Sequence, residues 1–143
     1  MAKDVAVSSA ARGGVELKDW RLDAGVGGLP RLTLECGEVF AELYLNGAHL
    51  TAFENRARGL SMFFVEPGTL LPGRAIKGGV PLVFPWFGPH TAEKGFPRHG
   101  FARNLSWAVA GETRSGEARG IALELVDNDC TKVLWPFAFQ AQI

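Results

Sequence analysis

Several stretches of the chain alternate apolar and polar residues with a period of two. In residues 38–45, Val39, Ala41, Leu43 and Leu45 share one face of an extended chain, and Glu, Phe and Tyr residues occupy the other. Alternation of this kind is typical of strands with one buried face. The same pattern predicts strands over residues 31–36, 38–45, 48–53, 61–65, 105–110, 120–126 and 137–143.

The dipeptide Asn46-Gly47 follows the second of these segments directly. Both residues tolerate positive φ, so this pair is a strong signal for a hairpin, and we expect residues 48–53 to fold back antiparallel. No window of helical length shows an apolar stripe at helical spacing. Many short strands joined by Gly, Pro and Asn predict an all-β protein, an antiparallel sandwich or barrel.

The length and composition limit the classes of protein and partner. The 143 residues suit one domain, with residues 1–15 as a flexible tail and residues 16–143 as the folded part. Lys+Arg and Asp+Glu both total 15, so the chain lacks the excess of basic residues that is typical of a nucleic-acid-binding protein. The first twenty residues lack the apolar core of a signal peptide, and no run approaches the roughly 18 apolar residues that span a bilayer. We therefore expect a cytoplasmic protein without a membrane or nucleic-acid partner.

The two cysteines, Cys36 and Cys130, stand far apart and form no zinc-binding spacing, so we expect no metal site. Free cysteines are often buried in proteins of reducing compartments, and we expect two buried thiols here. A disulfide between the two stays open as an alternative.

A loop-rich stretch interrupts the alternation between Leu70 and Trp107. It is rich in proline, glycine and large aromatic residues, among them Gly78, Gly79, Pro81, Phe84, Pro85, Trp86, Phe87, Pro89, Phe96, Pro97 and Phe101. One interpretation is a long connection that packs as a minor core over a sheet edge. The other is a functional loop, because long ordered loops often carry function.

Four candidate cations within this stretch favour the functional interpretation. They are Lys77, Arg98, His99 and Arg103, with Glu93 as the opposing charge. Arginine presents a planar fork to phosphate, and aromatic faces beside polar groups suit sugar rings. The pattern favours a small anionic ligand.

Two motifs carry a family resemblance. KGGVPLVFPWFG (77–88) and PRHGFARNLSW (97–107), followed by KVLWPFAF, resemble the amino-terminal half of the hexose-6-phosphate mutarotases of the aldose 1-epimerase-like superfamily. The family form reads RGG[IV]P, FPWFG and P-x-HGFAR. The resemblance implies a galactose-mutarotase-like β-sandwich that is truncated here, since the alternation runs to Ile143 without a closing turn.

The resemblance also implies a function and its residues. Lys77, Arg98, His99 and Arg103 match substrate-contacting positions, and Lys77 stands where the family usually has arginine. The implied reaction is acid/base interconversion of the α and β anomers of a hexose 6-phosphate, without a metal or cofactor. The family's proposed catalytic histidine and late glutamate have no match here, so we expect no catalytic residue and little activity in this chain alone. A half-sandwich also predicts self-association.

Two other functions stay open at this point. One is a non-catalytic carbohydrate-binding β-sandwich, and the other is an interaction domain whose aromatic loop docks a protein partner. Among the other histidines, we expect His49 to be a partly exposed structural residue in its strand, while His90 lies in the loop outside the family pattern.

Overall fold

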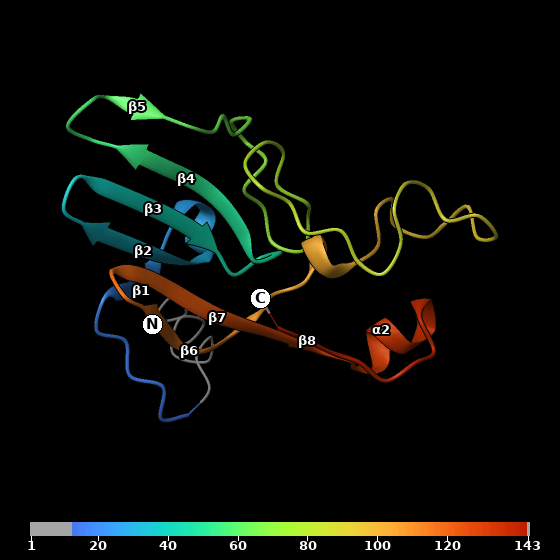
Figure 1. Ribbon diagram of the computed structural model, residues 1–143. Helices are drawn as coiled ribbons and strands as arrows, with labels where there is room; N and C mark the ends of the chain where they lie inside the picture. The colour runs from blue at the N-terminus through green and yellow to red at the C-terminus, as the bar shows by residue number, and fades with distance from the viewer. Residues whose placement is uncertain (1–12, 143) are drawn as a thin grey trace.

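The computed structural model describes residues 13–142, and five of its strands form one antiparallel sheet (Figure 1). The strands are β1 (Trp20–Ala24), β2 (Pro30–Cys36), β3 (Val39–Tyr44), β4 (His49–Asn55) and β5 (Leu60–Ser61), and they neighbour one another in chain order. A meander of this kind needs only short connections, and the turns between these strands are short. A 3-10 helix, η1 (Val26–Gly28), joins β1 to β2.

A second antiparallel sheet contains the strands β6 (Ala108–Ser115), β7 (Ala118–Val126) and β8 (Gln140–Gln142), in that order. A short helix, α2 (Asp129–Leu134), connects β7 to β8. Figure 1 shows this sheet crossing beside β1 and β2, with β4 and β5 on the far side of the larger sheet. The two sheets form an antiparallel β-sandwich, as the alternating pattern predicted.

The core lies between the two sheets and follows the predicted faces. Ala41, Leu43 and Leu45 are buried on the inner face of β3 and its extension, opposite Leu123 and Leu125 of β7. Paired strands place opposite residues on one face, so the register Leu32↔Leu43 and Leu34↔Ala41 keeps the apolar sets together. The rest of the cluster includes Trp20, Leu32, Leu34, Ala48, Ala102, Trp107 and Val109.

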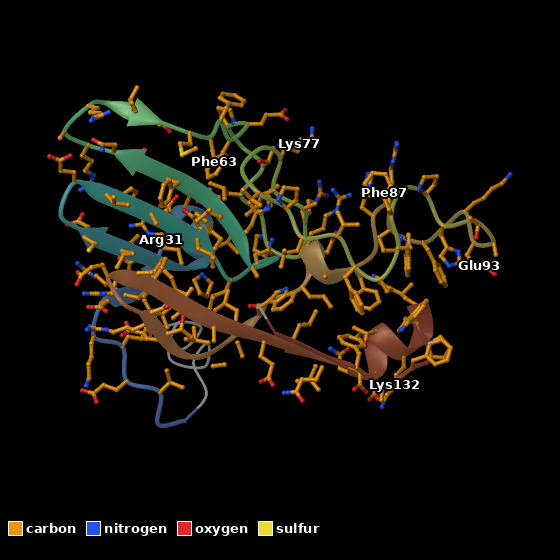
Figure 2. All side chains as sticks on the ribbon, in the orientation of Figure 1. Arg31, Phe63, Lys77, Phe87, Glu93 and Lys132 are labelled. Carbon is orange, nitrogen blue, oxygen red and sulfur yellow. The ribbon has the colours of Figure 1, made fainter. Side chains whose placement is uncertain are left out.

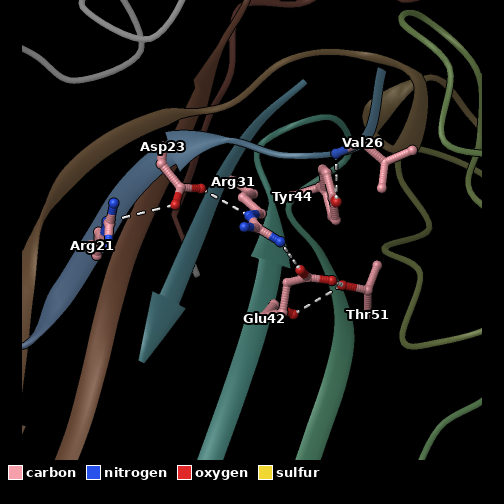
Figure 3. Close-up of polar contacts among 7 residues, drawn as sticks. All are labelled: Arg21, Asp23, Val26, Arg31, Glu42, Tyr44 and Thr51. Carbon is pink, nitrogen blue, oxygen red and sulfur yellow. Dashed lines mark hydrogen bonds and ion pairs between the residues drawn. The ribbon is translucent and has the colours of Figure 1, made fainter. Parts of the chain in front are cut away.

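Charged residues on the outer face of the large sheet tie four strands together (Figure 3). Arg31 of β2 donates to Asp23 of β1 at 2.8 Å and to Glu42 of β3 at 2.6 Å, and Thr51 of β4 donates to Glu42 at 2.8 Å. The hydrogen bond to Asp23 and that to Glu42 raise the pKa of Arg31 against the effect of its partial burial. Every charge of this network therefore has a partner.

A single carboxylate anchors the start of β1 to the second sheet. Oε1 of Glu112 on β6 accepts the backbone N–H groups of Lys18, Asp19 and Trp20 at 2.9, 2.8 and 2.7 Å. These hydrogen bonds join segments more than ninety residues apart in the chain. β1 was not among the predicted strands, because its apolar positions are few and charged residues flank them.

The inner face of the large sheet is left open at its β4–β5 side. Phe53 lies opposite the buried Ala41 and so points to the inner face, and Met62 donates its backbone N–H to the Phe53 carbonyl at 3.0 Å. Leu60, two residues before Met62, shares its face. Phe53, Leu60 and Met62 are nevertheless 40%, 57% and 68% exposed.

Most predicted strands are confirmed, with corrected limits. The Asn46-Gly47 hairpin is confirmed, since β3 and β4 pair antiparallel on either side of it. The strand predicted for 61–65 covers only Leu60–Ser61, and the one predicted for 105–110 begins at Ala108. The one predicted for 137–143 covers only Gln140–Gln142, and Ile143 lies outside the described residues.

A helix was not predicted at all, and α2 corrects this. Its Asn128 side chain accepts the N–H groups of Cys130 and Thr131, and Thr131 returns a hydrogen bond to the Asn128 backbone, which forms a capping box. Six residues are too few to show a periodic stripe. None of the helices that the structure describes is long and apolar enough to cross a membrane.

Two further expectations concern the cysteines and the tail. Cys36 and Cys130 are free and exposed, so the expected burial is wrong; both lie near chain reversals rather than on a core face. Residues 1–12 of the expected tail lie outside the described residues, and Val15 packs against the core cluster.

Candidate functional site

The loop-rich stretch lies between β5 and β6 and is held to the sandwich by isolated bridges rather than by strands of its own. The bridges pair Asn46 with Ser106, Leu50 with Val80, Val65 with Gly78, and Phe84 with Gly100. The buried Asn46 adds side-chain hydrogen bonds to the Arg74 carbonyl at 2.8 Å and from the Gly73 N–H at 3.0 Å. The loop is therefore ordered against the turn between β3 and β4.

The two sequence motifs cross at Phe84 and Gly100. The Phe84 carbonyl accepts the N–H groups of Phe101 at 2.9 Å and Ala102 at 3.2 Å. Gly100 has φ 69°, and a Cβ there would lie 1.9 Å from the Phe84 carbonyl oxygen. Only glycine combines this backbone conformation with so close an approach. The crossing brings the residues before Gly100 against the Trp86–Gly88 segment.

His99 is locked at this crossing by its own backbone and side chain. Its N–H donates to the Gly88 carbonyl at 2.7 Å, and its Nδ1 accepts the Gly88 N–H at 3.1 Å. The neutral ring therefore carries its hydrogen on Nε2. Desolvation, together with the nearby charges of Arg103 and Arg98, lowers the pKa of His99 below its ordinary value. A neutral imidazole with one free donor results.

Arg103 follows on a 3-10 helix, η2 (Ala102–Asn104), and is linked to Arg98. One terminal N–H of the half-buried Arg103 guanidinium donates to the Arg98 carbonyl at 2.7 Å, and the Arg98 side chain is exposed. The Nε atom of Arg103 is buried and has no hydrogen-bond partner. Among the described residues, no carboxylate forms an ion pair with Arg98 or Arg103. Both guanidinium groups thus keep their charge for a ligand.

Lys77 lies on a separate loop from Phe87, as Figure 2 shows. Its Nζ is 3.3 Å from a carboxylate oxygen of Glu66, and both side chains are largely exposed. Surface ion pairs of this kind are weak. The structure therefore brings together Arg98, His99 and Arg103, and leaves Lys77 on the neighbouring turn with an exchangeable partner.

His49 connects these two loops, and the expectation that it is partly exposed is wrong. The imidazole is completely buried, and its Nε2 lies 2.7 Å from the Gly78 carbonyl, one residue after Lys77. Desolvation lowers the pKa of His49, and the charge of Arg103 lowers it further. The hydrogen bond to Gly78 raises the pKa but does not offset these two effects. Nothing in the alternation of β4 predicts this burial, because a loop some thirty residues later covers the ring.

The aromatic residues of the loop divide into two groups. Trp86, His90 and Phe96 pack on one another with ring centroids 4.8 to 6.0 Å apart, and Trp86 donates its indole N–H to the Pro97 carbonyl at 3.1 Å. These contacts order the loop around Trp86. Phe87 is 82% exposed and meets His99 edge-on at 4.8 Å, beside the cations.

The remaining features do not add a metal site. In residues 13–142, no group of three His, Cys, Asp or Glu side chains is placed to hold a metal ion.

A cavity of about 450 Å³ lies next to the site, lined by Asn46, Gly73, Asn104, Ser106 and neighbouring residues. None of the four cations lines this cavity.

Comparisons with known proteins identify the family of the chain. Residues 30–143 match the aldose 1-epimerase family. The chain is 34% identical over 111 residues to a protein of Escherichia coli K12 and 33% identical to one of Salmonella typhimurium, both named "Putative glucose-6-phosphate 1-epimerase". The matched region is 78% of this chain and 37% of each relative.

A solved structure is similar over almost the whole chain. It is the crystal structure of a "putative mutarotase" from Salmonella typhimurium, with a TM-score of 0.79 and 28% sequence identity over 97% of this chain and 47% of that one. The chain thus spans less than half the length of these relatives and has the galactose-mutarotase type of β-sandwich. The motifs, the fold and the matched region together show that the chain belongs to the aldose 1-epimerase family.

Proposed function

We propose that this chain forms the sugar-phosphate-binding part of a hexose-6-phosphate 1-epimerase. The observation that carries the proposal is the group of Arg98, His99 and Arg103 at the motif crossing, where both arginines lack a carboxylate partner among the described residues. The names of the bacterial relatives support the substrate class.

The two arginines are suited to bind the phosphate group of the ligand. A guanidinium offers several N–H donors in one plane, and phosphate oxygens accept them in pairs. One terminal N–H of Arg103 donates to the Arg98 carbonyl, which orients the planar fork of this half-buried side chain. Lys77 would add a third, more distant cation by exchanging Glu66 for the ligand, because the exposed ion pair between Lys77 and Glu66 is weak.

His99 and Phe87 are suited to bind the sugar ring of the ligand. The neutral His99 keeps an Nε2–H donor for a sugar hydroxyl, since its Nδ1 is occupied by Gly88. The exposed ring of Phe87, next to His99, offers an apolar face for the C–H groups of a pyranose. An aromatic face beside a polar donor is a common arrangement in small-molecule sites.

The reaction of such an enzyme requires two proton transfers. A base removes the proton of the C1 hydroxyl while an acid protonates the ring oxygen, and the C1–O5 bond breaks to give the open aldehyde. After rotation about the C1–C2 bond, O5 attacks the other face of C1, and the two protons return in the reverse sense. Each positioned group contributes about 10²- to 10⁴-fold to the rate.

This chain holds the substrate but, in our proposal, not the full acid/base pair. His99 lies beside the arginines, whereas the imidazole of His49 is completely buried, and a single group does not serve both ends of the reaction readily. We therefore assign Arg98, His99, Arg103 and Lys77 to binding. The 143 residues alone bind the sugar phosphate without accelerating anomer exchange.

The test measures both properties on one sample. Isothermal titration with glucose 6-phosphate gives binding, and saturation-transfer NMR gives the exchange rate between its anomers. We expect binding that Arg103→Ala weakens at least tenfold and no acceleration by this chain. Acceleration by these 143 residues would show that they contain a complete acid/base pair. Absence of binding to any hexose phosphate would sink the proposal.

The alternative is a non-catalytic carbohydrate-binding sandwich that uses the same four binding residues. A chimaera in which this chain replaces the matched region of the Escherichia coli relative distinguishes the two, because an epimerase then accelerates anomer exchange and a binding module does not.

A further inference from the structure

The turn that carries Lys77 and the helix that carries Arg103 come from different parts of the loop, so something must hold them at a constant spacing. The Lys77 turn lies between two extended segments. Gly79 donates to the Phe64 carbonyl at 2.9 Å on one side, and Val80 donates to the Leu50 carbonyl at 2.9 Å on the other. η2 is placed separately, against the turn after β3, where a Cβ on Gly47 would lie 2.6 Å from the Arg103 carbonyl oxygen.

One buried side chain contacts the Lys77 turn. His49 is the first residue of β4 and is completely buried. Its Nε2 is 2.7 Å from the Gly78 carbonyl, and a Cβ on Gly79 would approach that nitrogen to 2.9 Å. His49 also follows by two residues Gly47, whose N–H donates to the Leu105 carbonyl at the end of η2 at 2.7 Å. His49 therefore touches the Lys77 turn directly and begins the strand whose preceding turn holds the Arg103 helix.

The hydrogen bond fixes the chemical form of the ring. The Gly78 carbonyl can only accept, so Nε2 carries the hydrogen. Nδ1 is buried and has no hydrogen-bond partner among the described residues, so a second hydrogen there would be unsatisfied and would face the Arg103 charge. The environment thus favours the neutral Nε2–H tautomer.

We propose that His49 is a positioning residue for the sugar-phosphate site. Its Nε2–H donates to the Gly78 carbonyl and thereby sets the place of Lys77 relative to Arg103. The inference rests on the proposed sugar-phosphate site, and it assigns His49 no contact with the ligand. A structural histidine without this role would stabilise the fold and leave the affinity for the ligand unchanged.

Two substitutions separate the hydrogen bond from the packing. His49→Gln keeps an N–H donor in reach of Gly78, and His49→Leu keeps an apolar side chain of similar bulk but removes the donor. Leu123→Val on β7, in the core between the sheets, is the control for a general loss of stability. Binding of glucose 6-phosphate is measured by isothermal titration for all four proteins.

We expect His49→Leu to weaken binding by about tenfold to a hundredfold, the range for losing a charge-assisted hydrogen bond from Lys77 to the phosphate. His49→Gln binds within about threefold of the wild type, and Leu123→Val binds like the wild type although its melting temperature falls. Unchanged binding by His49→Leu overturns the proposal. Equal losses in His49→Gln and His49→Leu also overturn it, because the donor would then not be the cause.

Two measurements do not depend on the ligand and judge the proposal if the wild type binds no sugar phosphate or if His49→Leu does not fold. In the wild type, the ¹⁵N shifts of His49 report a neutral ring with hydrogen on Nε2. An Nδ1–H tautomer contradicts the proposal. Amide hydrogen exchange at Gly79 and Val80 quickens at least tenfold in His49→Leu, or in His49→Ala, and not in His49→Gln. Equal exchange in all variants contradicts the proposal while leaving the proposed function to be judged by binding alone.

Discussion

Gly100→Ala is the substitution that most directly perturbs the crossing of the two motifs. Gly100 has φ 69°, and the new Cβ would lie 1.9 Å from the Phe84 carbonyl oxygen and 2.2 Å from the Phe84 carbonyl carbon. Both neighbours are backbone atoms, so no side chain can turn away to relieve the overlap. The loop must separate, and the hydrogen bonds of Phe101 and Ala102 to Phe84 lengthen.

The magnitude follows from two contributions. A non-glycine residue in the left-handed region costs about 1–2 kcal/mol. Forcing an extra carbon into a packed place costs about 1–3 kcal/mol. We expect Gly100→Ala to lower the free energy of unfolding by about 2–5 kcal/mol, which lowers the melting temperature of a domain of this size by roughly 6–20 °C. Binding of glucose 6-phosphate is lost as well, because His99 and Arg103 flank the displaced residue.

The same loop offers a matched control. Gly95 has no heavy atom within 4 Å of an added Cβ. Gly95→Ala should therefore change the free energy of unfolding by less than about 1 kcal/mol. Urea unfolding followed by circular dichroism measures both variants. A Gly100→Ala protein as stable as Gly95→Ala would refute the described crossing.

Three other predictions test separate parts of the structure. Partial desolvation of Glu112 is outweighed by the hydrogen bonds from Trp20, Asp19 and Lys18, so its pKa lies below its ordinary value of 4.5. The Glu112 carboxylate therefore stabilises the fold fully above about pH 4.5, and this stabilisation is lost as the pH falls through the lower pKa of the folded state. We expect Glu112→Ala to lower the free energy of unfolding, measured with urea, by about 1–3 kcal/mol at pH 7. A loss that is the same at pH 7 and pH 3 would contradict this assignment. Lys77→Arg restores a planar fork, and we expect it to tighten glucose 6-phosphate binding by about three- to tenfold in isothermal titration; equal or weaker binding would place Lys77 outside the site. The open inner face at Leu60 and Met62 should make the 143-residue chain associate with itself, and Met62→Lys should reduce that association in sedimentation velocity more than the control Val133→Lys on α2; a monomeric wild type would rule the prediction out.

The sandwich was predictable where alternation is regular. The inner faces of β3 and β7 follow directly from their sequences, and Asn46-Gly47 predicted the hairpin between β3 and β4. β1 was missed because its attachment depends on Glu112, a residue that lies some ninety positions away. α2 was missed because its cap, not a stripe of apolar residues, defines it.

The candidate site was predictable as a set of residue types but not as an arrangement. The motifs named Lys77, Arg98, His99 and Arg103; in the structure Arg103 donates to the Arg98 carbonyl, and Gly88 holds His99 between them in sequence. The separation of Lys77 and its pairing with Glu66 could not be predicted, because they depend on how a loop folds against β4. The burial of His49 has the same cause, since the ring is covered by Gly78 and Gly79 rather than by residues of its own strand.

The most direct test of the sugar-phosphate site is a ³¹P NMR titration of glucose 6-phosphate with the wild-type chain, with Arg103→Ala and with Arg58→Ala, an exposed arginine of the β4–β5 turn. The account predicts that the phosphate signal shifts and broadens with the wild type and with Arg58→Ala, and that Arg103→Ala weakens the effect at least tenfold. An unshifted phosphate signal with the wild type, or an equal effect of Arg103→Ala and Arg58→Ala, would contradict it.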